Sequence, residues 1–290
     1  MRYSQKNRLL GGLLALLLVC MPVSCDTRLG GSASDSTAPP VTGDGQEFVY
    51  PLTREDRRTE PQSPTVCDLG SVKKELVITD AGDYRLSGKL EGQIVVRAEE
   101  QVVHLFLDGV QVHSSSGPAL CVASAGKVVV TLCEGSENTL TDGASYLDDS
   151  FDACLYSLND LTLNGTGRLT VFGYYKDAVH TKDFLKIAGP TLSLRANDDA
   201  LHANDGMVIT GAKIAAEAES CGLRTTKKGK PRKGHIEITD ADLSVIAGKY
   251  AITSSGNLRI ASSTAFLKGI QSDCTAEGTI DIEEGNLRHE

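Results

Sequence analysis

Short apolar stretches separated by glycine, asparagine and aspartate run through the chain from about residue 66 onward. Examples are 76–78, 94–96, 103–107 and 128–132. None of them shows the ~3.6-residue period of an amphipathic helix, and runs of this length between turn residues are typical of β-strands. The pattern therefore predicts an all-β fold.

The pattern of apolar and polar positions also repeats. Asp177-Ala-Val-His-Thr-Lys-Asp183 returns as Asp199-Ala-Leu-His-Ala-Asn-Asp205, 22 residues further on. Each repeat begins with a small, an aliphatic and a polar or variable residue, and two further short strands follow. Self-similarity at roughly 20 to 50 residues marks units that bury their apolar faces by stacking on their neighbours. We therefore expect a single-stranded parallel β-helix (β-solenoid) with about three strands per coil of about 22 residues. A β-sandwich, the competing fold, gives no reason for a constant spacing.

Stacking predicts which side chains lie one above another. Alternate residues of a strand face opposite sides, and neighbouring coils lie ~4.8 Å apart. One step, from Leu223 to Ile252, is longer because loop 225–234 is inserted there. Such loops often emerge on the binding face, although a solvated charged loop explains this one equally well. The aliphatic positions should form one interior row of Leu155, Val179, Leu201, Leu223, Ile252 and Ile270.

The charge balance narrows the choice of partners. The chain has 290 residues with 38 Asp and Glu against 29 Lys and Arg, which gives a formal net charge of −9. General nucleic-acid binding requires a basic surface, so we expect no nucleic-acid partner.

The N-terminal region predicts export. Basic residues within 1–10 are followed by the apolar run 9–23, which is too short to span a membrane comfortably and is typical of a secretory signal. The run ends in Pro22-Val-Ser-Cys25, which resembles a bacterial lipoprotein signal with Cys25 as the acylated residue. An ordinary signal peptide cut nearby is the alternative.

These features predict three regions. We expect a lipoprotein signal peptide at 1–24, a flexible tether rich in Ser, Thr, Pro and Gly at 25–64, and a β-helix domain at 65–290. The protein would be exported and lipid-anchored in the bacterial cell envelope, touching the membrane through its lipid anchor only.

Six cysteines remain outside the signal, namely Cys67, Cys121, Cys133, Cys154, Cys221 and Cys274. Disulfides are permitted in an exported protein. Cys154, however, takes the small position that alanine holds in the following repeats, which favours a role as an apolar filler. We expect most of these thiols to be unpaired.

Stacking should also align acidic residues. Asp177 should lie beneath Asp199 with Asp198 beside them, while Asp183 and Asp205 should form a second column with Asn159. Close carboxylates repel unless one is protonated or a cation lies between them. Hard oxygen ligands suit Ca²⁺ and suit Zn²⁺ poorly. The alternative is that these residues only turn the corners of the coils. The candidate calcium ligands are Asp177, Asp183, Asp198, Asp199 and Asp205.

The outward position of the same repeat predicts a row that faces solvent. Tyr156, His180, His202 and Arg224 should stack in line, with Lys182 and the basic loop 225–234 beside them. A row of aromatic, imidazole and guanidinium groups can stack on or hydrogen-bond to a linear polar ligand. A solvated face and a transition-metal site at the two histidines are the alternatives.

Signals for catalysis are weak. No serine lies in a nucleophile-elbow context, and no cysteine is paired with a histidine by any pattern. Paired acids such as Asp198 and Asp199 keep a glycosidase possible, but carboxylate separation cannot be measured in a sequence.

Three further motifs carry a family resemblance. They are 82–88, 103–110 and 134–143, followed by the repeats of aspartate, small residue and aliphatic residue. Together they resemble a family of bacterial exported carbohydrate-binding domain proteins over about residues 76–285. The resemblance implies a right-handed parallel β-helix of the pectate-lyase-like type, bound calcium, and non-catalytic binding of an acidic plant polysaccharide such as polygalacturonate.

The chain departs from that family pattern in its aspartate column. The usual Asp-Gly-Ile is Asp177-Ala-Val and Asp199-Ala-Leu here, and Cys221, Tyr250 and Lys268 stand where the next three aspartates are expected. Only the middle coils could therefore retain a calcium site.

These observations lead to one expected function and two alternatives. We expect non-catalytic binding of an acidic polysaccharide, polygalacturonate or pectin-like, at the cell surface with the help of Ca²⁺. The alternatives are a polysaccharide lyase or glycoside hydrolase acting on uronic-acid polymers, and a surface adhesin with a protein partner.

Overall fold

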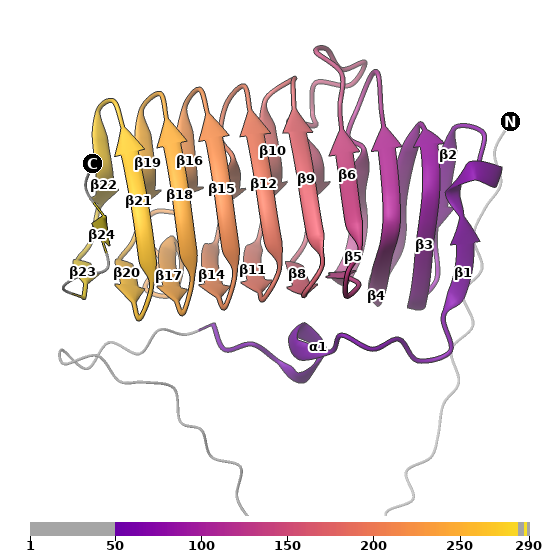
Figure 1. Ribbon diagram of the computed structural model, residues 1–290, viewed down its shortest axis with the longest axis horizontal. Helices are drawn as coiled ribbons and strands as arrows, with labels where there is room; N and C mark the ends of the chain where they lie inside the picture. Colours follow the sequence, from indigo (N-terminus) through magenta and orange to yellow (C-terminus); the bar gives the residue numbers. More distant parts are fainter. Residues whose placement is uncertain (1–49, 284–286, 289–290) are drawn as a thin grey trace, which may run out of the picture. The chain divides into compact units, whose positions relative to one another are not determined.

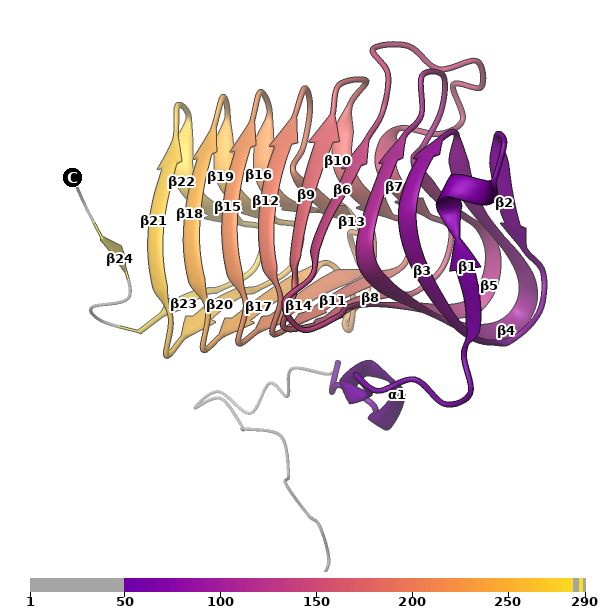
Figure 2. The same cartoon turned by 45° about the vertical axis from the view of Figure 1, so that its right-hand side comes forward.

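The chain winds into a parallel β-helix, as the repeat predicts (Figures 1 and 2). The structure is a computed structural model that describes residues 50–283 and 287–288, all within one compact unit. Every strand pairing among these residues is parallel. Helical structure in the described part is limited to α1 (Arg54–Arg57) and the 3₁₀ turn η1 (Leu69–Ser71). It contains no helix of sufficient length and hydrophobicity to span a membrane.

Each complete coil contributes one strand to each of three faces, which we call sheets A, B and C. Sheet A contains the first strand of every repeat, and it lies behind the front strands in Figure 1. Its members are β2 (Glu75–Ile78), the first parts of β4 (Gln93–His113) and β5 (Leu120–Leu132), β7 (Ala153–Ser157), β10 (Asp177–Thr181), β13 (Leu201–Ala203), β16 (Cys221–Thr225), β19 (Tyr250–Ser254) and β22 (Ser272–Ala276).

Sheets B and C contain the second and third strands. Sheet B holds β1 (Thr65–Asp68), the first part of β3 (Gly82–Glu91), the later parts of β4 and β5, β8 (Leu161–Gly165), β11 (Phe184–Ala188), β14 (Gly206–Thr210), β17 (His235–Thr239), β20 (Leu258–Ala261) and β23 (Ile280–Ile282). Sheet C holds the ends of β3 and β4, then β6 (Glu137–Thr141), β9 (Arg168–Gly173), β12 (Thr191–Ala196), β15 (Lys213–Ala218), β18 (Asp242–Ala247), β21 (Thr264–Gly269) and β24 (Leu287–Arg288).

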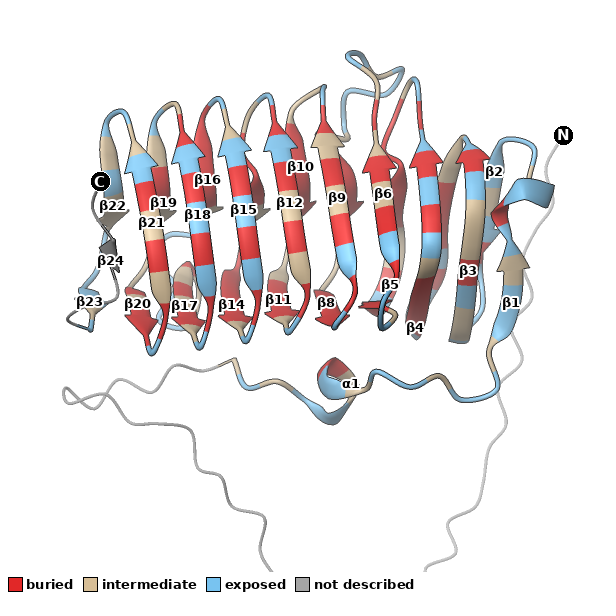
Figure 3. Ribbon diagram, viewed as in Figure 1, coloured by how far each residue is buried: buried red, intermediate tan, exposed pale blue. Residues whose placement is uncertain are grey.

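The interior is filled by aliphatic side chains that stack from coil to coil. Val179 pairs with Leu155 on one side and Leu201 on the other, and Leu201 pairs with Leu223. All are fully buried, and burying one such side chain stabilises a fold by about 1.5–3 kcal/mol. Along the sheet C strands, buried and exposed residues alternate, as expected for a sheet with one face packed on the core and one face in solvent (Figure 3).

The last predicted member of the interior row is wrong. Ile252 pairs with Cys274, whereas Ile270 is 84% exposed. For the same reason Ser272, and not Lys268, stands opposite Tyr250. The regular step from Ile252 ends at Cys274, and a cysteine fills a small apolar space as an aliphatic residue does. The sequence pattern favoured the nearer isoleucine because it required an aliphatic residue.

The prediction for the cysteines is confirmed in the described part of the chain, where all six are free thiols. Burial raises the pKa of Cys121 and of Cys274 to about 12, and that of Cys221 to about 11. A thiol that stays protonated is a poor nucleophile. These cysteines therefore act as packing residues.

The corner between sheets B and C uses left-handed backbone at successive coils. Gly165, Gly189 and Gly211 have φ values of 95°, 93° and 62°, and Asp240 and Ser262 follow with 52° and 49°. A side chain at Gly165 would also meet the carbonyl oxygen of Leu132 at 2.3 Å. Glycine is favoured at this corner because it accepts both the conformation and the close approach.

Residues 50–64, which composition assigned to the tether, lie against sheet B (Figure 1). We call this segment the strap. Its anchor is Asp56 of α1, which is fully buried and accepts hydrogen bonds from Thr162 (2.6 Å) and Lys186 (3.0 Å). Arg58 adds a two-pronged bond to Asp83 at 2.6 and 2.8 Å. Apart from the ring of Tyr50, which packs against Phe184, the strap is held mainly by polar contacts, so it has no apolar period that a sequence analysis could detect. Cys25 and the predicted signal lie outside the described residues.

Candidate functional site

The predicted row of side chains exists on the outer face of sheet A. Tyr156, His180, His202 and Arg224 pair in register through β7, β10, β13 and β16. The rings of His180 and His202 are stacked, with centroids 3.8 Å apart and planes inclined by 7°. The edge of Tyr156 meets His180 at 5.8 Å. The constant spacing of the coils therefore places one of these groups at every step along the face.

Only part of the row reaches solvent. Tyr156 and His180 are buried, because Phe151 covers the tyrosine and the flanking residues cover the histidine. The side chain of His202 is 13% exposed, whereas those of Lys182 and Arg224 are 33% and 39% exposed. The groups that a ligand would reach first are therefore the two cations, with the buried rings beneath them as support.

Three members of the row, His180, His202 and Arg224, are each held by a carboxylate of the preceding coil. Asp152 bonds His180 Nδ1 at 2.6 Å, and Asp177 bonds His202 Nδ1 at 3.0 Å. A carboxylate oxygen accepts, so each ring donates from Nδ1. Burial lowers the pKa of His202, which keeps that ring neutral and leaves its Nε2 as an acceptor. Arg224 donates to Asp199 at 2.9 Å in the same way. The repeat therefore fixes both the position and the hydrogen-bonding character of the row.

The two aspartates also bind backbone. Asp177 accepts the N–H of Asp199 at 3.0 Å, and Asp199 accepts the N–H of Cys221 at 2.9 Å. Both carboxyl groups are buried. Burial and the neighbouring charge of Asp199 raise the pKa of Asp177 well above its usual value. Burial lowers the pKa of His202 to about 4, although the charge of Asp199 opposes that shift.

The first predicted acidic column is confirmed as a cluster. Asp177, Asp198 and Asp199 each offer an oxygen within 4.8 Å of the others. Carboxylates that lie this close together and are shielded from water repel one another. The raised pKa of Asp177 reflects that repulsion together with its burial. A hard divalent cation would offset the repulsion and would find only oxygen ligands in this group. The donor set therefore fits Ca²⁺.

The same geometry argues against a transition-metal site at the two histidines. Asp177, His180 and His202 also come within 4.8 Å of one another. However, the imidazole planes are almost parallel and 3.8 Å apart, and an ion bound to a ring nitrogen lies in the plane of that ring. One ion cannot lie in both planes, so the stacked pair does not form a chelating site.

The second column is formed by the backbone but does not join this cluster. Asp205 donates its N–H to the carbonyl of Asp183 at 3.1 Å, one coil above the other. The carboxylate of Asp205 is ion-paired with Lys233 of loop 225–234. The side chain of Asn159 faces away from the column and accepts the N–H of Ala125 at 2.9 Å. The structure therefore separates Asp183 and Asp205 from the three other candidate ligands.

The inserted loop lies beside the accessible end of the row. It begins at Thr225, the last residue of β16 and the neighbour of Arg224, and Thr226 donates to Asn204 at 2.9 Å. Lys228 pairs with Glu277, whereas Lys230 and Arg232 are exposed. The loop therefore adds positive charge next to Arg224.

With this geometry in place, comparison with known proteins identifies the family. A model of the family described as "Carbohydrate-binding domain-containing protein" matches residues 73–286. The chain belongs to this carbohydrate-binding domain-containing family. Its match begins at β2 and includes sheet A, loop 225–234 and the complete row.

Two similar proteins extend the comparison. A carbohydrate-binding domain-containing protein of Acetivibrio thermocellus is 32% identical over 222 residues, which is 74% of this chain and 78% of that protein. The gadolinium derivative of the polysaccharide lyase-like protein from C. thermocellum is similar in structure, with a TM-score of 0.74 and 31% identity over 77% of this chain and 97% of that chain.

Sequence reasoning missed Asp152, the carboxylate that holds His180 in this carbohydrate-binding domain-containing protein. Asp177 and Asp199 stand three residues before the outward residue of their own coil, whereas Asp152 stands four residues before Tyr156. Because of this offset of one residue, Asp152 does not match the position of aspartate in the repeat. The pattern also carried no sign of Phe151, because loop 143–152 has no counterpart in other coils.

Proposed function

We propose that the chain binds an acidic polysaccharide of the polygalacturonate or pectin type along the outer face of sheet A, without catalysing a reaction. The observation that carries the proposal is the in-register row with two accessible cations, Lys182 and Arg224. Coils repeat every ~4.8 Å, so the face offers similar groups at a spacing close to the length of one sugar unit. Membership in a carbohydrate-binding domain-containing family supports the same ligand class.

Calcium has a defined place in this proposal. The carboxylates of Asp177, Asp198 and Asp199 would hold the ion, and Asp198 is the member that is only partly buried and makes no side-chain hydrogen bond within the described residues. A Ca²⁺ ion accepts six to eight oxygen ligands, so sites remain for the carboxylate of a uronic acid. The cation would thereby join an acidic chain to an acidic protein.

The basic groups contribute in a different way. Lys182 and Arg224 would pair with uronate carboxylates, while the stacked rings of His180 and His202 would support this surface from beneath. Loop 225–234 would attract the chain from a longer distance. Binding should therefore weaken with salt as well as with removal of calcium.

The location of the protein is the second part of the proposal. Cys25 would carry the lipid anchor, and residues up to the strap would connect it to the β-helix. Incorporation of labelled palmitate that is lost in Cys25→Ser tests the anchor. A Cys25→Ser protein that remains labelled and membrane-bound would refute it.

The test of the ligand is titration of polygalacturonate into the full exported protein, first with Ca²⁺ and then with excess chelator. We expect binding that falls at least tenfold when calcium is removed, and little binding of a neutral polymer such as dextran. Equal affinity with and without chelator would refute the role of calcium. Absence of polygalacturonate binding under both conditions would refute the ligand class.

A lyase is the second candidate function, because the similar solved protein is described as polysaccharide lyase-like. A cation at Asp177, Asp198 and Asp199 would make the proton next to a uronate carboxylate more acidic, and a neighbouring basic group would have to remove it. Ultraviolet absorbance from new unsaturated ends, formed on incubation with polygalacturonate and abolished by chelator, would favour this function over simple binding.

A further inference from the structure

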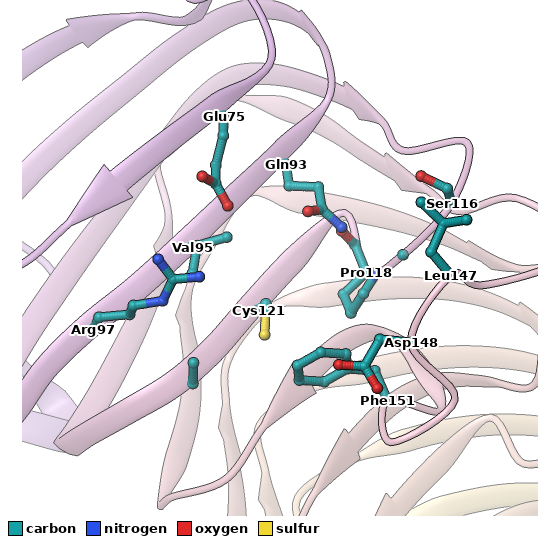
Figure 4. A pocket seen from close by; sticks show the side chains of 12 residues that line it. Glu75, Gln93, Val95, Arg97, Ser116, Pro118, Cys121, Leu147, Asp148 and Phe151 are labelled. Atoms are coloured by element: carbon teal, nitrogen blue, oxygen red, sulfur yellow. The ribbon is translucent and has the colours of Figure 1, made fainter.

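A groove of about 200 Å³ lies on the outer face of sheet A, at the N-terminal end of the row (Figure 4). It is formed by β2, β4 and β5, by the turn 114–119 between β4 and β5, and by loop 143–152, which connects β6 to β7. Neither the repeat nor the proposed cation site includes it. Its lining residues are Glu75, Gln93, Val95, Arg97, Ser116, Gly117, Pro118, Cys121, Ala123, Leu147, Asp148 and Phe151.

One wall of the groove is apolar. Phe151 presents its ring there, and its edge contact with Tyr156 at 5.2 Å fixes its position. Leu147 is 90% exposed, more than any other large hydrophobic residue in the described part of the chain. Leaving such a side chain in water forgoes the stabilisation that burial would give. A ligand in the groove would cover it.

The opposite wall is polar. Arg97 and Glu75 lie across the hollow from Asp148 and Phe151, with Cys121 between the two sides (Figure 4). Within the described residues, the side chains of Arg97 and Glu75 make no hydrogen bond or ion pair with other side chains or with backbone, so their polar groups remain available. Asp148 uses one oxygen for the N–H of Ser150 at 3.0 Å and keeps the other.

We propose that this groove is a binding subsite for one neutral pyranose. A sugar ring has an apolar face of C–H groups, which suits Phe151 and Leu147, and an edge of hydroxyls, which suits the planar polar groups of Arg97 and Glu75. The volume is below the ~300–1,000 Å³ of pockets for drug-sized ligands, which fits a single ring. Two carboxylates face one guanidinium, so a uronate would be repelled where a neutral sugar is not.

The groove continues the face that the row occupies. Cys121 pairs with Tyr156, which pairs with His180, so the groove lies about two coils before the first accessible cation. The subsite rests on the proposed function in one respect, since the neutral sugar would be an end or a branch of the acidic glycan bound on the row. The protein would then distinguish a branched or mixed pectic polymer from pure polygalacturonate.

The experiment measures neutral sugars directly by saturation-transfer and chemical-shift NMR on the exported chain. The probes are the methyl glycosides of galactose, glucose, mannose, rhamnose and xylose, with methyl galacturonide as the acidic comparison. The variants are Phe151→Leu, Arg97→Gln and Leu147→Ser. The last replaces a side chain that is 90% exposed and is matched by Ile246→Ser on sheet C, which is 45% exposed and outside the groove.

We expect at least one neutral glycoside to bind with a millimolar dissociation constant and to lose at least fivefold in affinity in each groove variant but not in Ile246→Ser. Titration of Arg97→Gln and Leu147→Ser with polygalacturonate should give wild-type affinity, which separates this subsite from the row. Absence of neutral binding, or preference for the galacturonide in the groove, would overturn the proposal. If Lys182→Gln lost polygalacturonate binding but still bound the neutral glycoside, the subsite would stand. The proposal for the row and the proposal for the groove can therefore be refuted independently.

Discussion

The carboxylate of Asp177 accepts the backbone N–H of Asp199, one coil further along the β-helix, at 3.0 Å. The same relationship recurs when Asp199 accepts the N–H of Cys221 at 2.9 Å. Each aspartate also holds the outward side chain of the next coil, His202 or Arg224. A single residue type therefore joins the coils and orients the face that we propose to bind glycan.

Removing this link should destabilise the fold. Asp177→Ala leaves the N–H of Asp199 and the Nδ1–H of His202 without their partner in a buried place. Each unsatisfied donor costs about 1–3 kcal/mol, so we expect the free energy of unfolding to fall by about 2–6 kcal/mol. Chemical denaturation in the presence of chelator measures this change.

The matched control is Asp198→Ala, in the adjacent position but without a side-chain hydrogen bond in the described structure. In chelator it should change stability by less than ~0.5 kcal/mol, as a surface substitution does. If Asp177→Ala and Asp198→Ala were equally mild, the hydrogen bonds of Asp177 would not be stabilising the coil junction.

Calcium should make Asp198→Ala destabilising as well, because Asp198 is one of the three proposed ligands of the ion. An ion that binds only the folded protein stabilises it by about 2.7 kcal/mol at a concentration one hundred times its dissociation constant. We therefore expect calcium to raise the melting temperature of the wild type, and Asp198→Ala to abolish most of that rise. The measurement is thermal unfolding with and without calcium, with Asp273→Ala, an exposed aspartate in β22, as the control.

The repeat made most of the fold predictable, because register in a β-helix depends on spacing alone. Val179 and Leu201 stack as expected, and so do His180 and His202. The prediction was wrong at Ile270, where a cysteine takes the interior place. Sequence spacing also could not show that loop 143–152 covers Tyr156, since a loop without a periodic pattern gives no position for its side chains.

The strap shows that polar contacts between distant parts of the chain also cannot be predicted from sequence spacing. Burial alone would raise the pKa of Asp56, but hydrogen bonds from Lys127, Thr162, the Thr53 backbone and Lys186 outweigh it and hold the pKa below its usual value. These partners lie 3 to 130 residues away in the sequence. Composition therefore assigned the strap to the tether, whereas its contacts attach it to sheet B.

Breaking that anchor should release the strap. Asp56→Ala leaves Lys127 and Lys186 without the carboxylate that neutralises them, and removal of one partner of a buried ion pair costs about 3–5 kcal/mol. We expect faster tryptic cleavage after Arg57 and Arg58 together with a lower free energy of unfolding. Glu55→Ala changes a partly exposed residue of the same turn. It should lower the free energy of unfolding by no more than about 1 kcal/mol and should leave the rate of tryptic cleavage close to that of the wild type.

A histidine beneath the strap should make stability depend on pH. Burial, followed by the positive charge of Arg58, lowers the pKa of His104 to about 4, although Asp83 opposes the shift. In the unfolded chain the pKa is ~6.5, so between these values the unfolded state binds more protons than the folded state. Stability contributed by His104 is therefore present above pH ~6.5 and is lost as the pH falls towards ~4.

The size of this effect follows from the shift. At about 1.4 kcal/mol per pKa unit, the loss approaches 3 kcal/mol across the window. His104→Gln, which keeps a donor for Thr131, should flatten the dependence of unfolding free energy on pH between about 6.5 and 4. A slope that is the same in His104→Gln and in the wild type would assign the pH dependence to other groups.

Lys182 offers the most direct test of ligand recognition on the row. Its ammonium lies 5.5 Å from the Tyr156 ring centroid and 3.4 Å from Asp152, and a third of its side chain is exposed. A partly exposed charge contact is worth up to about 1 kcal/mol, so Lys182→Gln should weaken polygalacturonate binding about fivefold. The reduction should shrink as salt is added, because screening already weakens the wild-type contact. Arg195→Gln makes the same change of charge on the exposed face of sheet C and should leave affinity unchanged. If both variants weakened binding equally, the ligand would be responding to the total charge of the protein and not to the row on sheet A.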